Sequence, residues 1–287
     1  MHLTCPPFRV RYADTDAQGV AYYGSYFAWM EVGEIHFLEQ IGLHVPDLER
    51  RGLVLTVAET YMRYRRPASY GDLLAVRTRV LATAPKRFLL ENQIVRVEDG
   101  AVLAVGRLSD VVRDASGGVQ PVPEPLVERA EQRVERVVIS PRVARYLVPT
   151  PLGAPEHTHE IRVRYAETDA QGVAYYGSYF TWFEEGRNEL TRAMGLPYSE
   201  IERGGTVLPV AEAYCRYLAP LRPCDRFLMT TAVPAAEGAR MTFSNRMASL
   251  DGQAPIALGF TVHACTGPDG RPHGLDPELV ERFSPTP

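Results

Sequence analysis

The sequence lacks any apolar stretch of the roughly 18 residues that a membrane helix needs, and its start, MHLTCPPFRVRY, has no basic region followed by an apolar one. We therefore expect a cytoplasmic protein that does not contact a membrane. Basic residues are not in excess either, because the formal net charge is −4 and the pI is about 6.0. Such a chain has no positive field for a phosphate backbone, so we expect no nucleic-acid partner.

Cysteine and histidine are also scarce. The four cysteines follow no repeated spacing of the kind that marks a disulfide framework or a metal site, so we expect reduced thiols and no bound metal. In its other features the composition is that of an ordinary globular protein. With 287 residues, 45% hydrophobic and 23% charged, the chain has the length and composition of about two globular domains.

Part of the sequence is written twice. VRYADTDAQGVAYYGSYFAWMEVG at residues 10–33 returns as VRYAETDAQGVAYYGSYFTWFEEG at residues 163–186, an offset of 153 (163 minus 10) at which four of the 24 aligned positions differ. The repeat keeps acidic, glycine and aromatic residues in order, which a hydrophobic core alone does not require. It therefore indicates shared chemistry as well as shared architecture.

The same offset aligns residues well beyond the motif, such as Tyr64 with Tyr217 and Asn92 with Asn245. We expect a first module over residues 1–130, a linker over 131–160 and a second module over 161–287. The end of the linker is rich in Pro and Gly and predicts an extended connector.

Each module predicts one helix and several strands. In the first module, a short β-prone segment at 8–12 precedes the DTDAQG turn, and apolar residues at helical spacing then run to Gly42, which suits a glycine cap. Period-two segments at 53–64, 72–82, 87–97 and 102–112 predict strands. The fold class is thus α+β, with a long central helix wrapped by a mainly antiparallel sheet of about five strands in each module. We expect the two modules to pair as an intramolecular pseudo-dimer.

The order of strand, DTDAQGVAYYGSY, helix and four strands resembles the hotdog-fold thioesterases of the 4-hydroxybenzoyl-CoA thioesterase type, including acyl-CoA thioesterases associated with the Tol-Pal system. The resemblance covers nearly all of both modules. It implies hydrolysis of acyl-CoA thioesters, and it implies that the second acidic residue of each motif, Asp16 and Asp169, is catalytic. Some relatives have a His where Tyr23 and Tyr176 stand. This chain resembles the version with Tyr, in which a backbone N–H polarises the carbonyl.

The motif contains what thioester hydrolysis requires. An ordinary carboxylate is ionised at pH 7, so Asp16 or Asp169 is suited to act as nucleophile or as general base on water. Residues Tyr23 and Gly24, and their copies Tyr176 and Gly177, fall where a helix begins. N–H groups at a helix N-terminus carry partial positive charge and can form an oxyanion hole, each donor contributing on the order of 3 kcal/mol. A thiolate leaves with little protonation, which agrees with the absence of a repeated histidine.

A structural interpretation stands beside each catalytic one. Asp14 and Asp16 are also residues that cap helices or form Asx turns, and we expect this role for Asp14 because its copy is a glutamate. Glu31 and Glu184 lie on the predicted helix, where each either orients the Asp or a water, or makes an ordinary hydrogen bond.

Arg63, Arg65, Arg66 and Arg216 are candidates for contacts with the phosphates of coenzyme A, although a solvated strand edge explains them equally well. Leu218 and Ala219 replace Arg65 and Arg66 in the second module. If coenzyme A binds through these groups, the two sites are not equivalent.

Three other functions stay open. A thioesterase acting on acyl carrier protein performs the same reaction on a protein-borne substrate. A non-catalytic acyl-thioester-binding module would keep the pocket but would not need both aspartates. A hotdog hydratase would need a positioned histidine, which does not repeat. For a coenzyme A thioesterase we expect a small-molecule acyl-CoA substrate, no cofactor beyond the coenzyme A that is part of that substrate, and a homodimer of the two-module chain.

Overall fold

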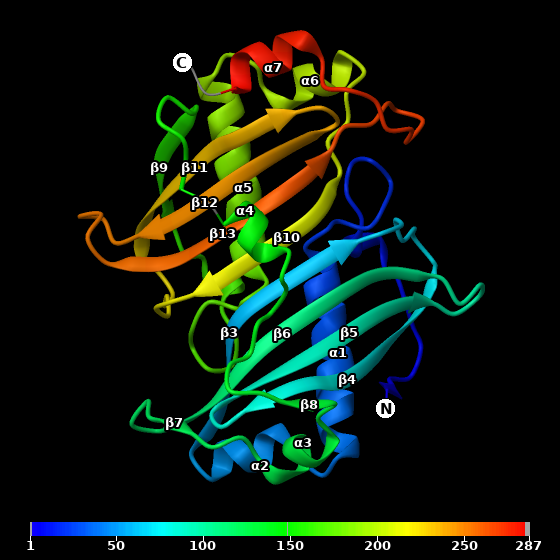
Figure 1. The fold of residues 1–287 in the computed structure, drawn as a ribbon, viewed down its shortest axis with the longest axis vertical. Helices are drawn as coiled ribbons and strands as arrows, with labels where there is room; N and C mark the ends of the chain where they lie inside the picture. Colours follow the sequence, from blue (N-terminus) through cyan, green and yellow to red (C-terminus); the bar gives the residue numbers. More distant parts are fainter. Residues whose placement is uncertain (1, 148, 285–287) are drawn as a thin grey trace. The chain divides into compact units, whose positions relative to one another are not determined.

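The computed structural model describes residues 2–147 and 149–284. The chain divides into two compact units, module 1 (Met1–Ser140) and module 2 (Pro141–Pro287). In each, Figure 1 shows one long helix lying across one face of an antiparallel sheet. This is the α+β arrangement that the sequence predicts.

Module 1 is built on the helix α1 (Ser25–Gln40), which is followed by the short α2 (Val45–Arg50). Its main strands are β3 (Leu53–Tyr64), β4 (Leu73–Ala84), β5 (Arg87–Arg96) and β6 (Val102–Asp114). They pair in the order β4-β5-β6-β3. Smaller elements complete the module: β1 (Leu3–Thr4), β2 (Phe8–Arg9), the 3-10 turn η1 (Tyr12–Asp14), β7 (Val119–Gln120), α3 (Glu124–Arg129) and β8 (Gln132–Arg133).

Module 2 repeats the plan around α5 (Ser178–Ala193), with strands in the order β10-β13-β12-β11-β9. Its elements are α4 (Val143–Tyr146), β9 (Glu156–Arg162), η2 (Tyr165–Glu167), α6 (Tyr198–Arg203), β10 (Val210–Tyr217), β11 (Arg226–Glu237), β12 (Arg240–Ala248), β13 (Pro255–Ala264) and α7 (Pro277–Phe283). The strand β9 begins at Glu156, inside the segment that the sequence indicates as a connector.

The sequence predicts the helix and strands closely because their periodicity reflects burial. On α1 the side chains of Phe27, Met30, Phe37 and Leu38 are almost fully buried against the sheet. The helix ends at Gln40, and Gly42 follows with a φ of +81°, a conformation that favours glycine. No helix in residues 2–147 and 149–284 is long and apolar enough to cross a membrane.

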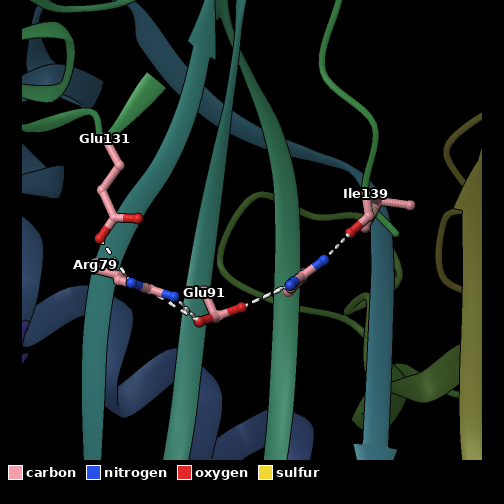
Figure 2. A network of polar contacts seen from close by, with 5 residues as sticks. Arg79, Glu91, Glu131 and Ile139 are labelled. Carbon is pink, nitrogen blue, oxygen red and sulfur yellow. Dashed lines mark hydrogen bonds and ion pairs between the residues drawn. The ribbon is translucent and has the colours of Figure 1, made fainter. Parts of the chain in front are cut away.

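Residues 131–139, at the start of the segment between the repeats, run from the edge of module 1's sheet, where β8 pairs with β4, across the outer face of the sheet to Arg107 on β6. The outer face is the one that does not carry α1 (Figure 1). Figure 2 shows the polar network that holds these residues there. Arg79 donates to Glu131 at 2.7 Å and to Glu91 at 2.5 Å, while Arg107 donates to Glu91 at 2.8 Å and to the carbonyl of Ile139 at 3.1 Å. Residues 131–139 are thus a packed part of module 1.

Candidate active site

Asp16 and Asp169 occupy the same tight turn in the two modules. The Oδ1 of Asp16 accepts a hydrogen bond from the N–H of Gln18 at 2.9 Å, and the Oδ1 of Asp169 accepts one from Gln171 at 2.9 Å. The turns close at Gly19 and Gly172, whose φ angles of +77° and +73° suit glycine. The Asx turn that the sequence offers as an alternative is therefore formed, and it orients the carboxylate.

Asp14, the first acidic residue of the motif, serves the architecture. Its carboxylate accepts from the backbone N–H of Arg11 at 2.8 Å and from the Arg11 guanidinium at 2.7 and 3.1 Å. Burial alone would raise the pKa of Asp14, but the hydrogen bonds from Arg11 outweigh burial and lower the pKa below its usual range. Glu167 makes the same contacts with Arg164 in module 2. Asp14 is thus held ionised and bound, in keeping with the structural role expected for it.

The loop that leads into α1 is hydrogen-bonded to the backbone of Asp14. The backbone carbonyl of Asp14 accepts from the N–H of Tyr22 at 2.8 Å and from the hydroxyl of Ser25 at 3.0 Å. In module 2 the carbonyl of Glu167 accepts from Tyr175 at 2.8 Å and from Ser178 at 3.0 Å. The order of Asp, Tyr and Ser in the motif therefore fixes how the loop feeds into the helix.

A tyrosine from the sheet fixes the peptide group between Tyr23 and Gly24. The hydroxyl of Tyr64 on β3 donates to the carbonyl of Tyr23 at 2.8 Å, and Tyr217 on β10 donates to the carbonyl of Tyr176 at 2.9 Å. In a trans peptide the N–H points away from the carbonyl. The Tyr64 hydroxyl therefore sets the direction of the Gly24 N–H.

Gly24 stands directly before the first residue of α1. Within residues 2–147 and 149–284 its N–H has no hydrogen-bond acceptor, and the same holds for Gly177 before α5. A Cβ on either glycine would lie 2.4 Å from an aromatic carbon of Tyr22 or Tyr175. The glycine thus permits close approach of a ring and presents a donor at a helix N-terminus, the geometry that an oxyanion hole requires.

The sequence predicts that the backbone N–H groups of Tyr23 and Gly24 are candidate donors for an oxyanion hole. The two residues have different surroundings in the structure. Tyr23 is buried against Tyr22 and Tyr64, with ring centroids 4.8 and 6.3 Å away. The orienting hydroxyl of Tyr64 was missed as a functional group, although its conserved offset with Tyr217 was a visible signal.

The remaining candidates lie on the two long helices and at the ends of β3 and β10. Glu31 and Glu184 are half-buried on α1 and α5. Arg63, Arg65 and Arg66 are exposed at the end of β3. That end borders the helix start, because the Ala68 N–H donates to the Tyr26 hydroxyl at 2.9 Å and the Ala68 carbonyl accepts from Ala21 at 2.8 Å.

The corresponding end of β10 in module 2 is less basic. Arg216 is exposed there, but Leu218 follows with 43% of its surface exposed. No group of three or more His, Cys, Asp and Glu side chains gathers to hold a metal ion within the part of the chain that the structure describes.

Known proteins are similar to this chain in sequence. The family model of the thioesterase-like superfamily matches residues 10–130 and again residues 163–283. A relative in Bacillus subtilis is 35% identical over 78 residues, which are 27% of this chain and 56% of that protein. The acyl-CoA thioester hydrolase of Escherichia coli O6:H1 is 28% identical over 124 residues, which are 43% of this chain and 92% of that protein.

A solved structure supports the fold. The 12:0-ACP thioesterase of Umbellularia californica superimposes with a TM-score of 0.72 at 12% identity, covering 92% of this chain and 94% of its own. At that identity the likeness shows the fold alone, with two hotdog modules in one chain. Together with the family match over both repeats, it shows that this chain belongs to the thioesterase-like superfamily and carries the family's domain twice.

Proposed function

We propose that this thioesterase hydrolyses acyl-coenzyme A esters to free acid and coenzyme A at a site in each module. Asp16 or Asp169 delivers the attacking oxygen, as nucleophile or as general base on water. The N–H of Gly24 or Gly177 binds the negative charge that develops on the carbonyl oxygen. The observation that carries the proposal is the duplicated pairing of an oriented aspartate with a helix N-terminal N–H that has no acceptor among the described residues.

Two further features support coenzyme A as the carrier. The exposed guanidiniums of Arg63, Arg65 and Arg66 border the helix start of module 1, where they are suited to bind phosphate. In addition, the E. coli relative is named as an acyl-CoA thioester hydrolase. Because Leu218 and Ala219 replace two of these arginines, we expect module 1 to bind the coenzyme more tightly than module 2.

The test is thiol release from a panel of acyl-CoA esters, with one acyl-carrier-protein ester included. Wild type and the Asp16→Asn/Asp169→Asn double variant are compared, with circular dichroism to confirm that the double variant is folded. We expect release from acyl-CoA by the wild type and a loss of at least about 1,000-fold in the double variant. Release only from the carrier-protein ester would replace the substrate class. Undiminished release in the folded double variant would remove the aspartate mechanism.

A further inference from the structure

Module 1 buries two carboxyl groups against each other between its helix and its sheet. Glu34 on α1 is 8% exposed, and Asp110 on β6 is 1% exposed. Neither carboxylate oxygen of Asp110 has a donor within the part of the chain that the structure describes. Burying an unpaired carboxylate is costly, whereas two carboxyl groups that retain a proton can hydrogen-bond to each other.

The charged groups around this pair are few. Glu31 lies one helical turn before Glu34 on α1 and repels it, and Arg87 at the start of β5 is the cation among the described residues that acts on Asp110. Arg87 is itself paired with Glu59 of β3 at 3.4 Å. On β4, the residues that meet α1 nearby are the uncharged Val76 and Thr78.

Burial is the largest cause that raises the pKa of both groups. The charge of Glu31 raises the pKa of Glu34 further, while the contact with Asp110 lowers it. The pKa of Asp110 is raised further by Glu34. The pKa of Glu34 rises to about 8, while that of Asp110 lies well above its usual range. The pair therefore keeps at least one proton at pH 7 and gains a buried negative charge as the pH rises through about 8.

Module 2 has basic residues at the two corresponding positions. The residues 153 further on are Arg187 and His263. His263 is 4% exposed, with its Nδ1 2.7 Å from the carbonyl of Leu208 and its Nε2 3.0 Å from the hydroxyl of Thr261. Module 2 thus has no carboxyl pair at this place.

We propose that Glu34 and Asp110 are positioning residues whose retained proton limits the negative charge buried between α1 and the sheet, and which slow the reaction of module 1 alone when they lose it. The proposal rests on the proposed function. Glu34 lies ten residues after Gly24, about 15 Å along the helix. A new negative charge at that distance from a developing oxyanion slows the reaction about sixfold at an effective dielectric constant of about 20.

Aspartate variants separate the two modules for the test. With Asp169→Asn only module 1 turns over, and with Asp16→Asn only module 2 does. We measure kcat/KM for an acyl-CoA ester from pH 6 to pH 9.5 in each background, with and without Glu34→Gln. We expect the chain with active module 1 to lose about sixfold above pH 8, and Glu34→Gln to abolish that loss. A fall that persists in Glu34→Gln, or that is equal in the chain with active module 2, overturns the proposal.

Thermal unfolding of the same proteins, read against pH, gives a second measurement that needs no activity. The melting temperature of module 1 should fall as the pH rises from about 5 to about 8, because Glu34 loses its proton near its ordinary pKa of 4.5 in the unfolded chain but only near 8 in the folded one. Glu34→Gln and Asp110→Asn should each reduce that fall. If no thioester is hydrolysed, the proposed function fails while this melting experiment still tests the pair. A melting temperature equally flat in wild type and variants would overturn the carboxyl pair itself.

Discussion

The two modules share nearly every residue of the active loop (residues 14–24 and 167–177) and differ on one face of the sheet. On the outer face of module 1's sheet, Arg79, Glu91 and Arg107 form an ionic network. The same positions in module 2 are Ala232, Ser244 and Phe260.

In module 2, Phe260 packs between Tyr214 and Tyr146 of α4, with ring centroids 5.4 and 5.2 Å away. The same fold therefore accommodates either an ionic network or aromatic packing at equivalent positions, provided that the three residues of each module suit one another. The turn that carries the aspartate, in contrast, is the same in both modules.

Removing the centre of the ionic network should have the largest effect on stability. Glu91→Ala leaves Arg79 and Arg107 without their shared carboxylate, and since both arginines are partly exposed, we expect module 1 to lose about 3 kcal/mol. Hydrogen exchange in urea, read separately for peptides of each module, measures this loss. The triple exchange Arg79→Ala/Glu91→Ser/Arg107→Phe, which copies module 2, should cost less than Glu91→Ala alone. If the triple variant loses as much stability as the three single changes added together, the three residues do not act as one interacting set.

The active loop should respond alike in both modules. Gly24→Ala and Gly177→Ala each place a methyl group 2.4 Å from a tyrosine ring, which displaces the N–H that we assign to the oxyanion. We expect kcat/KM of the affected module to fall about 100-fold, corresponding to about 2.7 kcal/mol. The measurement is made with the other module's aspartate replaced by asparagine. If either glycine tolerates alanine without loss, its N–H is not the donor.

The sequence was sufficient for the parts of the fold that follow from local patterns. Alternation placed a strand at 53–64, where β3 lies, and the glycine cap placed the end of α1. It was not sufficient for contacts between distant residues. Tyr64 and Tyr23 are 41 residues apart in the chain, and only the folding of β3 onto the helix start brings the hydroxyl to that carbonyl.

For the same reason, the carboxyl pair could not be predicted from the sequence. Glu34 and Asp110 lie far apart in the chain, and neither belongs to the DTDAQGVAYYGSY motif. The packing of α1 on β6 makes them partners.

Lowering the pH should destabilise module 2, whereas raising the pH should destabilise module 1. Burial, aided by Arg187, lowers the pKa of His263 to about 3, whereas an unfolded histidine titrates near 6.5. The unfolded state thus binds the proton first, so the stability from neutral His263 is full above pH 6.5 and is lost as the pH falls toward 3. At pH 5 we expect module 2 to have lost about 2 kcal/mol relative to pH 7, measured by hydrogen exchange of β13. His263→Asn should remove this dependence, and a variant that keeps it would assign the acid loss to another group.

The smallest expected effect comes from one methylene group in the motif. Glu167 reaches the Nε1 of Trp182 at 3.0 Å in addition to its bonds with Arg164. Glu167→Asp should lose that hydrogen bond and cost module 2 about 1 kcal/mol, read from urea unfolding. Asp14→Glu in module 1 is the matched control. A cost equal in both exchanges would show that the length of the side chain, and not the tryptophan contact, matters.

The central claim is that the repeated motif forms two working sites, each dependent on its own aspartate. The most direct measurement is whether the rates of thiol release add. At saturating acyl-CoA, Asp16→Asn and Asp169→Asn should each keep part of the wild-type rate, the two rates should sum to it, and the double variant should release no thiol above background. If both single replacements abolish release, the two aspartates serve one site. If one abolishes release and the other leaves it unchanged, one module alone is catalytic, and either result contradicts the account of two working sites.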